Sequence, residues 1–285
     1  MTDETRSASR TAVMVAAYRG RATSRPERLC DDPFAAELAG DEGLAIAARY
    51  DVAFAHTELW IALRTRVLDA QVRARIADGA RQVVLLGAGL DTRAVRLAQP
   101  GVRFFEVDQP ASQADKRARL ATLADYPANA ATYVPCDFER DDFLERLAAN
   151  GFDAAAPAIF LWEGVTYYLA EAAVRSTLRR LATGTAPRSV VVFDYVRKRF
   201  AHGELRDGDA DAREHVAELG EPILFGTDDM LPIVHDAGFR RLRLASFDEL
   251  CLNVTGTYER ARKFRFQQLA IASVAADNLG CDGLP

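Results

Sequence analysis

The sequence predicts an α/β protein with a doubly wound, mostly parallel sheet that follows a helical N-terminal segment. Short apolar runs rich in β-branched residues alternate with helical patterns from residue 79 onward, which is typical of parallel α/β sheets. The first of these runs ends in the glycine-rich segment Gly87-Ala88-Gly89. A length of 285 residues suits one such core with helical additions.

Composition narrows the class of partner. Hydrophobic residues make up 49% of the chain and charged residues 27%, the balance of a globular protein. The net charge of −5 leaves no basic stripe for a nucleic acid backbone, so a small molecule is the expected partner. No apolar run is long enough to span a bilayer and no leader segment is evident, which predicts a cytoplasmic protein that does not associate with a membrane.

The cysteine and histidine residues predict neither disulfides nor a metal site. The four cysteines lie far apart and form no C-x-x-C pair. The four histidines have no metal-ligand spacing, and none is marked as a catalytic base. The catalytic residue therefore stays unassigned.

Residues 1–78 are expected to form a helical extension that contributes to the site. Its clearest helix spans residues 56–77, with an apolar stripe at intervals of three and four residues: Leu59, Leu63, Val67, Ala70, Ala74 and Ala77. Arg64 and Arg66 flank this stripe, where charged heads can lie at the edge of a buried face.

The segment 79–285 is expected to form the sheet domain. Its predicted strands are residues 82–86, 102–107, 131–135, 158–161, 189–196, 241–247 and 264–273. Its predicted helices are residues 91–97, 110–123, 142–149 and 170–182, and one more that Thr227 caps and Gly238 ends. Residues 197–220 are too long and too rich in charge for an ordinary connection, which predicts a lid insertion.

The glycine turn after the first strand is the first candidate site. A side chain at Gly87 or Gly89 would obstruct backbone approach to a ligand, and ligands of open α/β sheets bind at this edge. Two glycines can also make a simple tight turn, so the turn alone is a weak indication.

An acidic residue at the end of the second strand strengthens the prediction. Asp108 stands where a carboxylate can accept both hydroxyl groups of a ribose, and it could also cap the helix that begins near Pro110. A dinucleotide fingerprint requires a third glycine three positions after Gly89, but Thr92 occupies that position. An NAD(P)-dependent Rossmann oxidoreductase therefore stays an alternative that Thr92 opposes.

Five ordered motifs resemble the leucine carboxyl methyltransferase-like family, in particular its bacterial branch of class I S-adenosylmethionine (SAM)-dependent O-methyltransferases. The motifs are R-P-E-R-L-C-D-D-P-F-A at residues 25–35, R-T-R at 64–66, L-G-A-G-L-D-T-R at 86–93, F-E-V-D-Q-P at 105–110 and W-E-G-V-T-Y-Y-L at 162–169. The resemblance implies a Rossmann-like fold whose final strand is antiparallel, and SAM as the cofactor, with S-adenosylhomocysteine (SAH) as its product.

The resemblance also assigns residues to parts of SAM. It implies that the guanidinium groups of Arg25 and Arg66 hold the methionine carboxylate, with Arg64 as the alternative to Arg66. It also implies that the backbone of the glycine turn contacts the methionine end of SAM. It assigns the ribose hydroxyl groups to Asp108 and the adenine to Asp137 and Phe138. It places Glu163 near the amino acid end of SAM or its sulfonium. The predicted cofactor-binding residues are Arg25, Arg66, Gly87, Gly89, Asp108, Asp137, Phe138 and Glu163.

The expected reaction is O-methylation of a carboxyl or hydroxyl group on a small metabolite. Methyl transfer from a sulfonium is an in-line displacement, so the main task of the enzyme is to align the reactants in a dry site. A carboxylate acceptor needs no base, whereas a hydroxyl gains from one. A protein C-terminal carboxylate is an alternative acceptor, and a non-catalytic SAM-binding protein is an alternative function. The acceptor and the oligomeric state stay open.

Overall fold

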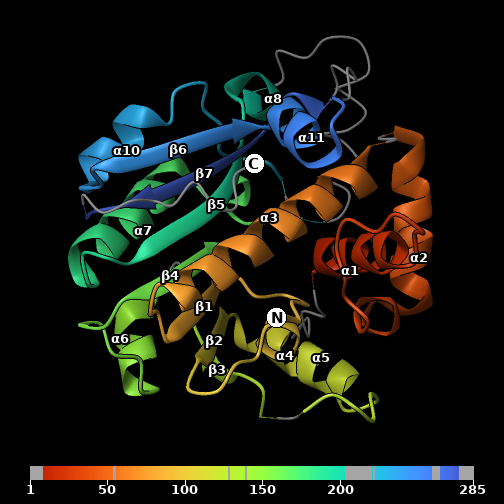
Figure 1. The fold of residues 1–285 in the computed structure, drawn as a ribbon, viewed down its shortest axis with the longest axis horizontal. Coiled ribbons are helices and arrows are strands. Elements are labelled where there is room, and N and C mark those ends of the chain that lie inside the picture. Colours follow the sequence, from red (N-terminus) through yellow and green to blue (C-terminus); the bar gives the residue numbers. More distant parts are fainter. Residues whose placement is uncertain are drawn as a thin grey trace, which may run out of the picture.

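The computed structural model describes residues 9–53, 56–127, 129–138, 140–202, 220, 222–258 and 264–275. Its centre is a seven-stranded sheet of order β3-β2-β1-β4-β5-β7-β6 (Figure 1). The strands are β1 (Gln82–Leu86), β2 (Arg103–Asp108), β3 (Thr132–Pro135), β4 (Ala158–Trp162), β5 (Val190–Val196), β6 (Arg241–Ser246) and β7 (Gln267–Ser273). All seven strands lie inside the ranges predicted from the sequence or within one residue of them, and β7 begins three residues later than predicted.

The strands β1 to β5 are parallel, and β7 runs antiparallel between β5 and β6. This order confirms the predicted Rossmann-like, mostly parallel sheet with an antiparallel last strand. Leu85 pairs in register with Leu161 on β4, and Leu86 pairs with Val107 on β2. The carboxyl ends of β1, β2 and β4 therefore lie at one edge, which is where open α/β sheets bind ligands.

Helices cover both faces of the sheet (Figure 1). They are α1 (Arg10–Thr23), α2 (Ala35–Ala53), α3 (Thr57–Ala77), α4 (Arg93–Arg96), α5 (Pro110–Leu120), α6 (Phe143–Ala149), α7 (Glu171–Gly184), α8 (Lys198–His202), α10 (Leu231–Ala237) and α11 (Phe247–Thr255), with the 3₁₀ turn η1 (Thr166–Tyr168). Side chains of α1, α2, α3 and α11 share one apolar cluster, and those of α6, α7 and α10 share the other. Along β1, Val83 and Leu85 join the first cluster and Val84 and Leu86 the second, because alternate side chains of a strand face opposite sides.

The buried face of α3 differs from the predicted stripe. Leu63 and Val67 are buried as expected, but Ala74 is only half-buried and Ala77 is exposed. The larger Trp60, Leu68, Val72 and Ile76, which the stripe did not include, face the core together with Leu63. Larger apolar side chains remove more area from water, so they determine which side of the helix faces the sheet.

This rotation of the helix separates Arg66, the predicted cofactor residue, from Arg64, which was its alternative. Arg64 lies four residues after Trp60 and four before Leu68, so it belongs to the buried face and is 2% exposed. Arg66 lies about 200° further around the helix axis and is exposed.

Several connections also differ from prediction. The helix expected at residues 91–97 is the single turn α4. Thr227 does not cap α10; its hydroxyl donates to the Asp229 carbonyl at 2.9 Å, and α10 begins at Leu231. Helix α11 was not predicted, although Ser246 and Glu249 form a capping box at its start. Most of the predicted lid, residues 203–219, lies outside the described residues.

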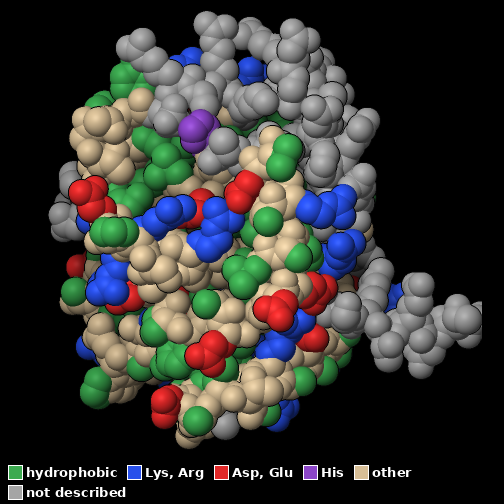
Figure 2. Space-filling view, turned by 90° about the vertical axis from the view of Figure 1, so that its right-hand side faces the viewer, with side chains coloured by type: hydrophobic (Ala, Val, Ile, Leu, Met, Phe, Trp, Pro, Cys, Tyr) green, Lys and Arg blue, Asp and Glu red, His purple; other side chains and the backbone are tan. Residues whose placement is uncertain are grey.

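The surface and the helices add two observations. Figure 2 shows the side of the molecule that carries α1 and α2, where basic and acidic side chains are intermixed instead of forming a single basic stripe. Among the described helices, none combines the length and the apolar character that crossing a bilayer requires.

Candidate functional site

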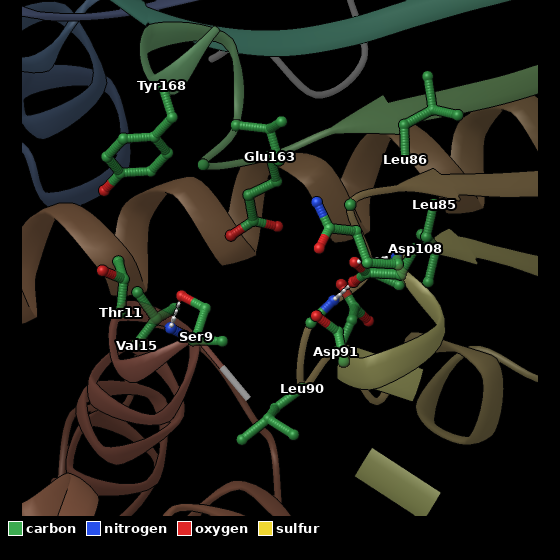
Figure 3. Close-up of a pocket in the computed structure, with 18 of the residues that line it drawn as sticks. Ser9, Thr11, Val15, Leu85, Leu86, Leu90, Asp91, Asp108, Glu163 and Tyr168 are labelled. Atoms are coloured by element: carbon green, nitrogen blue, oxygen red, sulfur yellow. Dashed lines mark hydrogen bonds between the residues drawn. The ribbon is translucent and has the colours of Figure 1, made fainter. Parts of the chain in front are cut away.

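A cavity of about 1080 Å³ lies at the carboxyl ends of β1, β2 and β4. Helix α1, the glycine turn after β1, the loop after β3 and η1 surround it. Figure 3 shows Asp108 and Asp91 on one side, Glu163 in the middle, and Tyr168, Thr11 and Val15 on the opposite side. The cavity therefore has room for a cofactor and a second small molecule, since ligand pockets commonly measure about 300–1,000 Å³.

The glycine turn depends on glycine for two physical reasons. Gly87 and Gly89 have φ values of +69° and +47°, a region that side chains disfavour. A Cβ at Gly87 would lie 2.5 Å from Cγ2 of Val165, and one at Gly89 would lie 3.2 Å from Cβ of Ala12. Crowding at these positions comes from neighbouring protein atoms, whereas the sequence analysis expected it from a ligand.

Asp108 ties the end of β2 to the glycine turn. Its Oδ2 accepts the N–H of Gly89 at 2.7 Å, and its Oδ1 accepts the N–H of Gln109 at 2.7 Å. Burial raises the pKa of Asp108, and these two backbone donors offset the effect only in part. A carboxylate held in this way keeps further lone pairs available to hydroxyl donors in the cavity.

Glu163 stands directly after β4, between two buried arginines. Its Oε1 accepts Nε of Arg64 at 2.9 Å, and its Oε2 accepts Nη1 of Arg93 at 2.6 Å. Burial alone would raise the pKa of Glu163, but the positive charges of Arg93 and Arg64 outweigh it and lower the pKa to about 2. Glu163 is thus a carboxylate at neutral pH.

Arg64 links Glu163 to β5. Its Nη1 donates to Oδ2 of Asp194 at 2.5 Å, and the other oxygen of Asp194 accepts the N–H of Gly164 at 2.7 Å. Asp194 therefore holds both the arginine and the loop that carries Glu163. The long-range neighbours of Arg64 explain its burial, since a buried charge needs paired and hydrogen-bonded partners.

Arg19 of α1 also lines the cavity, as do Arg10 and Arg140. Its Nε donates to Oδ2 of Asp32 at 2.8 Å, and its Nη2 donates to the carbonyl of Leu90 at 2.5 Å. These bonds fasten α1 to the glycine turn, and they bring the N-terminal helix into the site.

The structure brings most of the predicted residues together and leaves out the two arginines. Gly87, Gly89, Asp108, Asp137, Phe138 and Glu163 line the cavity. Arg66 does not line it, because the rotation of α3 points this residue to solvent. Arg25 does not line it either: it borders a separate 420 Å³ hollow, where its Nε pairs with Oε1 of Glu58 at 2.7 Å.

Arg25 and Arg66, which were predicted to bind the cofactor, do not line this cavity, whereas Arg19 and Arg64 do. Sequence reasoning missed Arg19 altogether, and it considered Arg64 only as an alternative. A signal for Arg64 was present in the spacing of Trp60, Arg64 and Leu68, which share one helical face. In the part of the chain that the structure describes, His, Cys, Asp and Glu form no group of three or more suited to a metal ion.

Comparisons with known proteins agree with this architecture. The sequence pattern of the leucine carboxyl methyltransferase family matches residues 12–182. A protein of Mycobacterium sp. (strain JLS), named as an S-adenosyl-L-methionine-dependent methyltransferase, is 36% identical over 239 residues, which are 78% of this chain and 78% of that protein. A similarly named protein of Streptomyces coelicolor is 38% identical over 192 residues, 63% of this chain and 66% of that protein.

Solved structures support the fold. A crystal structure described as a methyltransferase from Thermobifida fusca YX superposes with a TM-score of 0.63 at 17% identity and covers 95% of this chain and 96% of that one. The predicted family and its SAM cofactor are confirmed by the sequence matches. The chain belongs to the leucine carboxyl methyltransferase family, and it is a SAM-dependent methyltransferase.

Proposed function

We propose that this protein transfers the methyl group of SAM to an oxygen atom of a small metabolite, either a carboxyl or a hydroxyl group. The observation that carries the proposal is the cavity that holds Asp108 and Glu163 at the carboxyl ends of β2 and β4, the two parallel strands on either side of β1. These carboxylates match two of the hydrogen-bond donating parts of SAM, its ribose and its amino group.

The cavity residues fit SAM as a set. Asp108 would accept the ribose hydroxyl groups, Asp137 and Phe138 would contact the adenine, and Glu163 would accept the ammonium group. Arg64 or Arg19 would face the methionine carboxylate in place of Arg66 and Arg25. When bound, SAM supplies an electrophilic methyl group on a sulfonium.

The acceptor would lie on the side of the cavity away from Asp108. Val15 and Tyr168 lie on that side (Figure 3), and Leu224 also lines the cavity. The N–H of Leu224 donates to the carbonyl of Tyr167 at 2.7 Å, which keeps this segment next to η1. Apolar walls of this kind suit the body of a small metabolite, with few polar groups to orient it.

Alignment of the acceptor oxygen with the methyl group of SAM would account for most of the rate enhancement. A carboxylate acceptor needs no base, and a hydroxyl acceptor would release its proton to water as the oxygen–carbon bond forms and the carbon–sulfur bond breaks. No histidine is found among the described residues that line the cavity. The name of the family favours a protein C-terminal carboxylate as a second acceptor class.

The test has two stages with purified protein. Calorimetry with SAH is expected to give binding, and absence of binding would sink the proposal; NADH serves as the negative control. Incubation with SAM, a metabolite panel and peptides with free carboxyl termini is then analysed by mass spectrometry for methylated products. Methylation of a small carboxylate or hydroxyl supports the proposal, whereas methylation of peptides alone favours the second acceptor class, and binding without any turnover favours a non-catalytic protein.

The pH dependence of cofactor binding is expected to report Asp108. The pKa of Asp108 lies above its ordinary value of 3.8, and hydroxyl groups bind the ionised form, so SAH affinity should fall as the pH falls through the raised pKa. Glu163 stays ionised over the same range because its pKa is about 2. Calorimetry at a series of pH values measures the effect, and Asp108→Asn should remove this titration. A wild-type affinity that stays constant down to about pH 4 would contradict this expectation.

A further inference from the structure

Arg93 ends the L-G-A-G-L-D-T-R motif, but none of the cofactor contacts proposed above uses it. It stands at the start of the short helix α4 and is 1% exposed. It does not line the cavity. A fully buried arginine is costly unless its partners repay the loss of hydration, so its position calls for an explanation.

The contacts of Arg93 converge on three acidic residues. Its Nη1 donates to Oε2 of Glu163 at 2.6 Å and to Oδ2 of Asp91. Its Nε donates to Oδ1 of Asp69 at 2.7 Å, and its own backbone N–H donates to Oδ1 of Asp91 at 2.6 Å. One side chain thereby joins α3, the glycine turn and the end of β4.

Two arginines hold Glu163, one at each oxygen. Arg64 binds Oε1 from α3, and Arg93 binds Oε2 from α4. The Glu163 side chain is 12% exposed, and it borders the cavity. A carboxylate held at both oxygens has little rotational freedom, which is how supporting residues keep a binding group in its productive geometry.

We infer that Arg93 is a positioning residue: it holds the Glu163 carboxylate at the cavity wall in the orientation that receives the ammonium group of SAM. The inference rests on the proposed contact between Glu163 and that ammonium group. It gives the arginine of the glycine-turn motif a role in cofactor affinity although this residue touches no cofactor.

The charges around Glu163 define a measurable signature of this role. Arg93 of α4, Arg64 of α3 and Arg19 of α1 favour the ionised carboxylate, while Asp194 of β5 and Tyr167 of η1 are the acidic groups that face it. Burial raises the pKa of Glu163, and Arg93 makes the largest opposing contribution. Removing Arg93 should therefore raise the pKa of Glu163, and cofactor affinity should then fall with decreasing pH at higher pH values than in the wild type.

The experiment measures SAH affinity by calorimetry from about pH 8 to about pH 5 in the wild type and in Arg93→Gln. We expect the variant to lose affinity relative to the wild type by about tenfold for each pH unit below the raised pKa of Glu163. The contribution of Asp108 is common to both proteins, so it cancels in the ratio of their affinities.

Arg96→Gln is the matched control. Arg96 stands on the same helix and shares Asp69 as a partner, with its Nη1 2.6 Å from Oδ2, but it forms no bond to Glu163. We expect this variant to lose stability without changing the pH profile of SAH binding. Arg93→Lys keeps the positive charge and should restore the wild-type pH profile.

Repeating the Arg93 substitution in the Glu163→Gln variant separates a positioning role of Arg93 from a general loss of structure. In Glu163→Gln, adding Arg93→Gln should produce no further pH-dependent loss. An affinity ratio between Arg93→Gln and wild type that does not depend on pH, or a pH-dependent loss that persists with Glu163→Gln, would overturn the inference.

The proposed contact between Glu163 and the ammonium group is tested by comparing wild type with Glu163→Gln. If both bind SAH equally well, that contact is wrong and the inference about Arg93 loses its basis. If Arg93→Gln does not fold, adding Asp69→Asn removes one of the three acids that Arg93 contacts, and the same pH series is measured on that double variant.

Discussion

Replacing Arg64 by methionine is expected to abolish measurable SAH binding and to lower the free energy of unfolding by about 3–5 kcal/mol. Arg64 is fully buried between Glu163 and Asp194, at 2.9 Å and 2.5 Å. Methionine fills a similar length but leaves both carboxylates without their shared cation, and uncompensated buried charge is among the most destabilising changes known in proteins. Denaturant unfolding and calorimetry with SAH measure the two effects.

Arg66→Met is the control for this substitution. It changes the same residue type two positions away on α3, but its side chain is exposed. We expect a change in unfolding free energy within about 0.5 kcal/mol and no change in SAH affinity. If Arg66→Met weakened SAH binding and Arg64→Met did not, the assignment of the cofactor arginine from the structure would be wrong.

Replacing Asp108 by alanine is expected to weaken SAH binding by about 1–3 kcal/mol, which corresponds to about 5- to 150-fold in the dissociation constant. The loss has two sources. The ribose hydroxyl groups lose their acceptor, and the N–H of Gly89, 2.7 Å from Oδ2, loses the partner that holds the glycine turn. Calorimetry with SAH gives the affinity, and a thermal melt without ligand reports the second source.

A second ligand and a control variant show whether the effect of Asp108→Ala arises at the ribose. Adenosine is expected to lose a similar factor to SAH, because it carries the same ribose. Asp115→Ala, an acidic residue of α5 that pairs with Arg119 at 2.7 Å, should leave the affinity unchanged. An unchanged dissociation constant in Asp108→Ala would remove Asp108 from the cofactor site.

The sheet was predictable because its signal is local. The strands β1, β4 and β5 are predominantly apolar runs with glycine, proline or charged residues next to them, and the alternation with helices indicates parallel pairing. The boundaries of α4 and α10 were predicted less well. Tertiary contacts determine where such short helices begin, so Thr227 is a turn residue despite its favourable capping side chain.

The predicted half of the site also rests on local rules. Gly87, Asp108, Asp137 and Glu163 each follow the carboxyl end of a strand, and the parallel arrangement brings these ends to one edge. The arginines follow no such rule. Arg25 and Arg66 came from position within motifs, which says nothing about the direction in which a long side chain points.

The sequence by itself thus determined the fold class and the sheet edge that forms the site, because hydrophobic periodicity and glycine turns act over a few residues. The family was indicated by the resemblance of its five ordered motifs. Only the tertiary structure decided which arginines face the cavity. The rotation of α3 depends on packing Trp60, Leu68 and Ile76 against the sheet, and it buries Arg64 beside residues far away in the sequence. The network of Arg64, Arg93, Glu163 and Asp194 joins four separate elements, and its charges are stable in the interior only because folding brings these partners together.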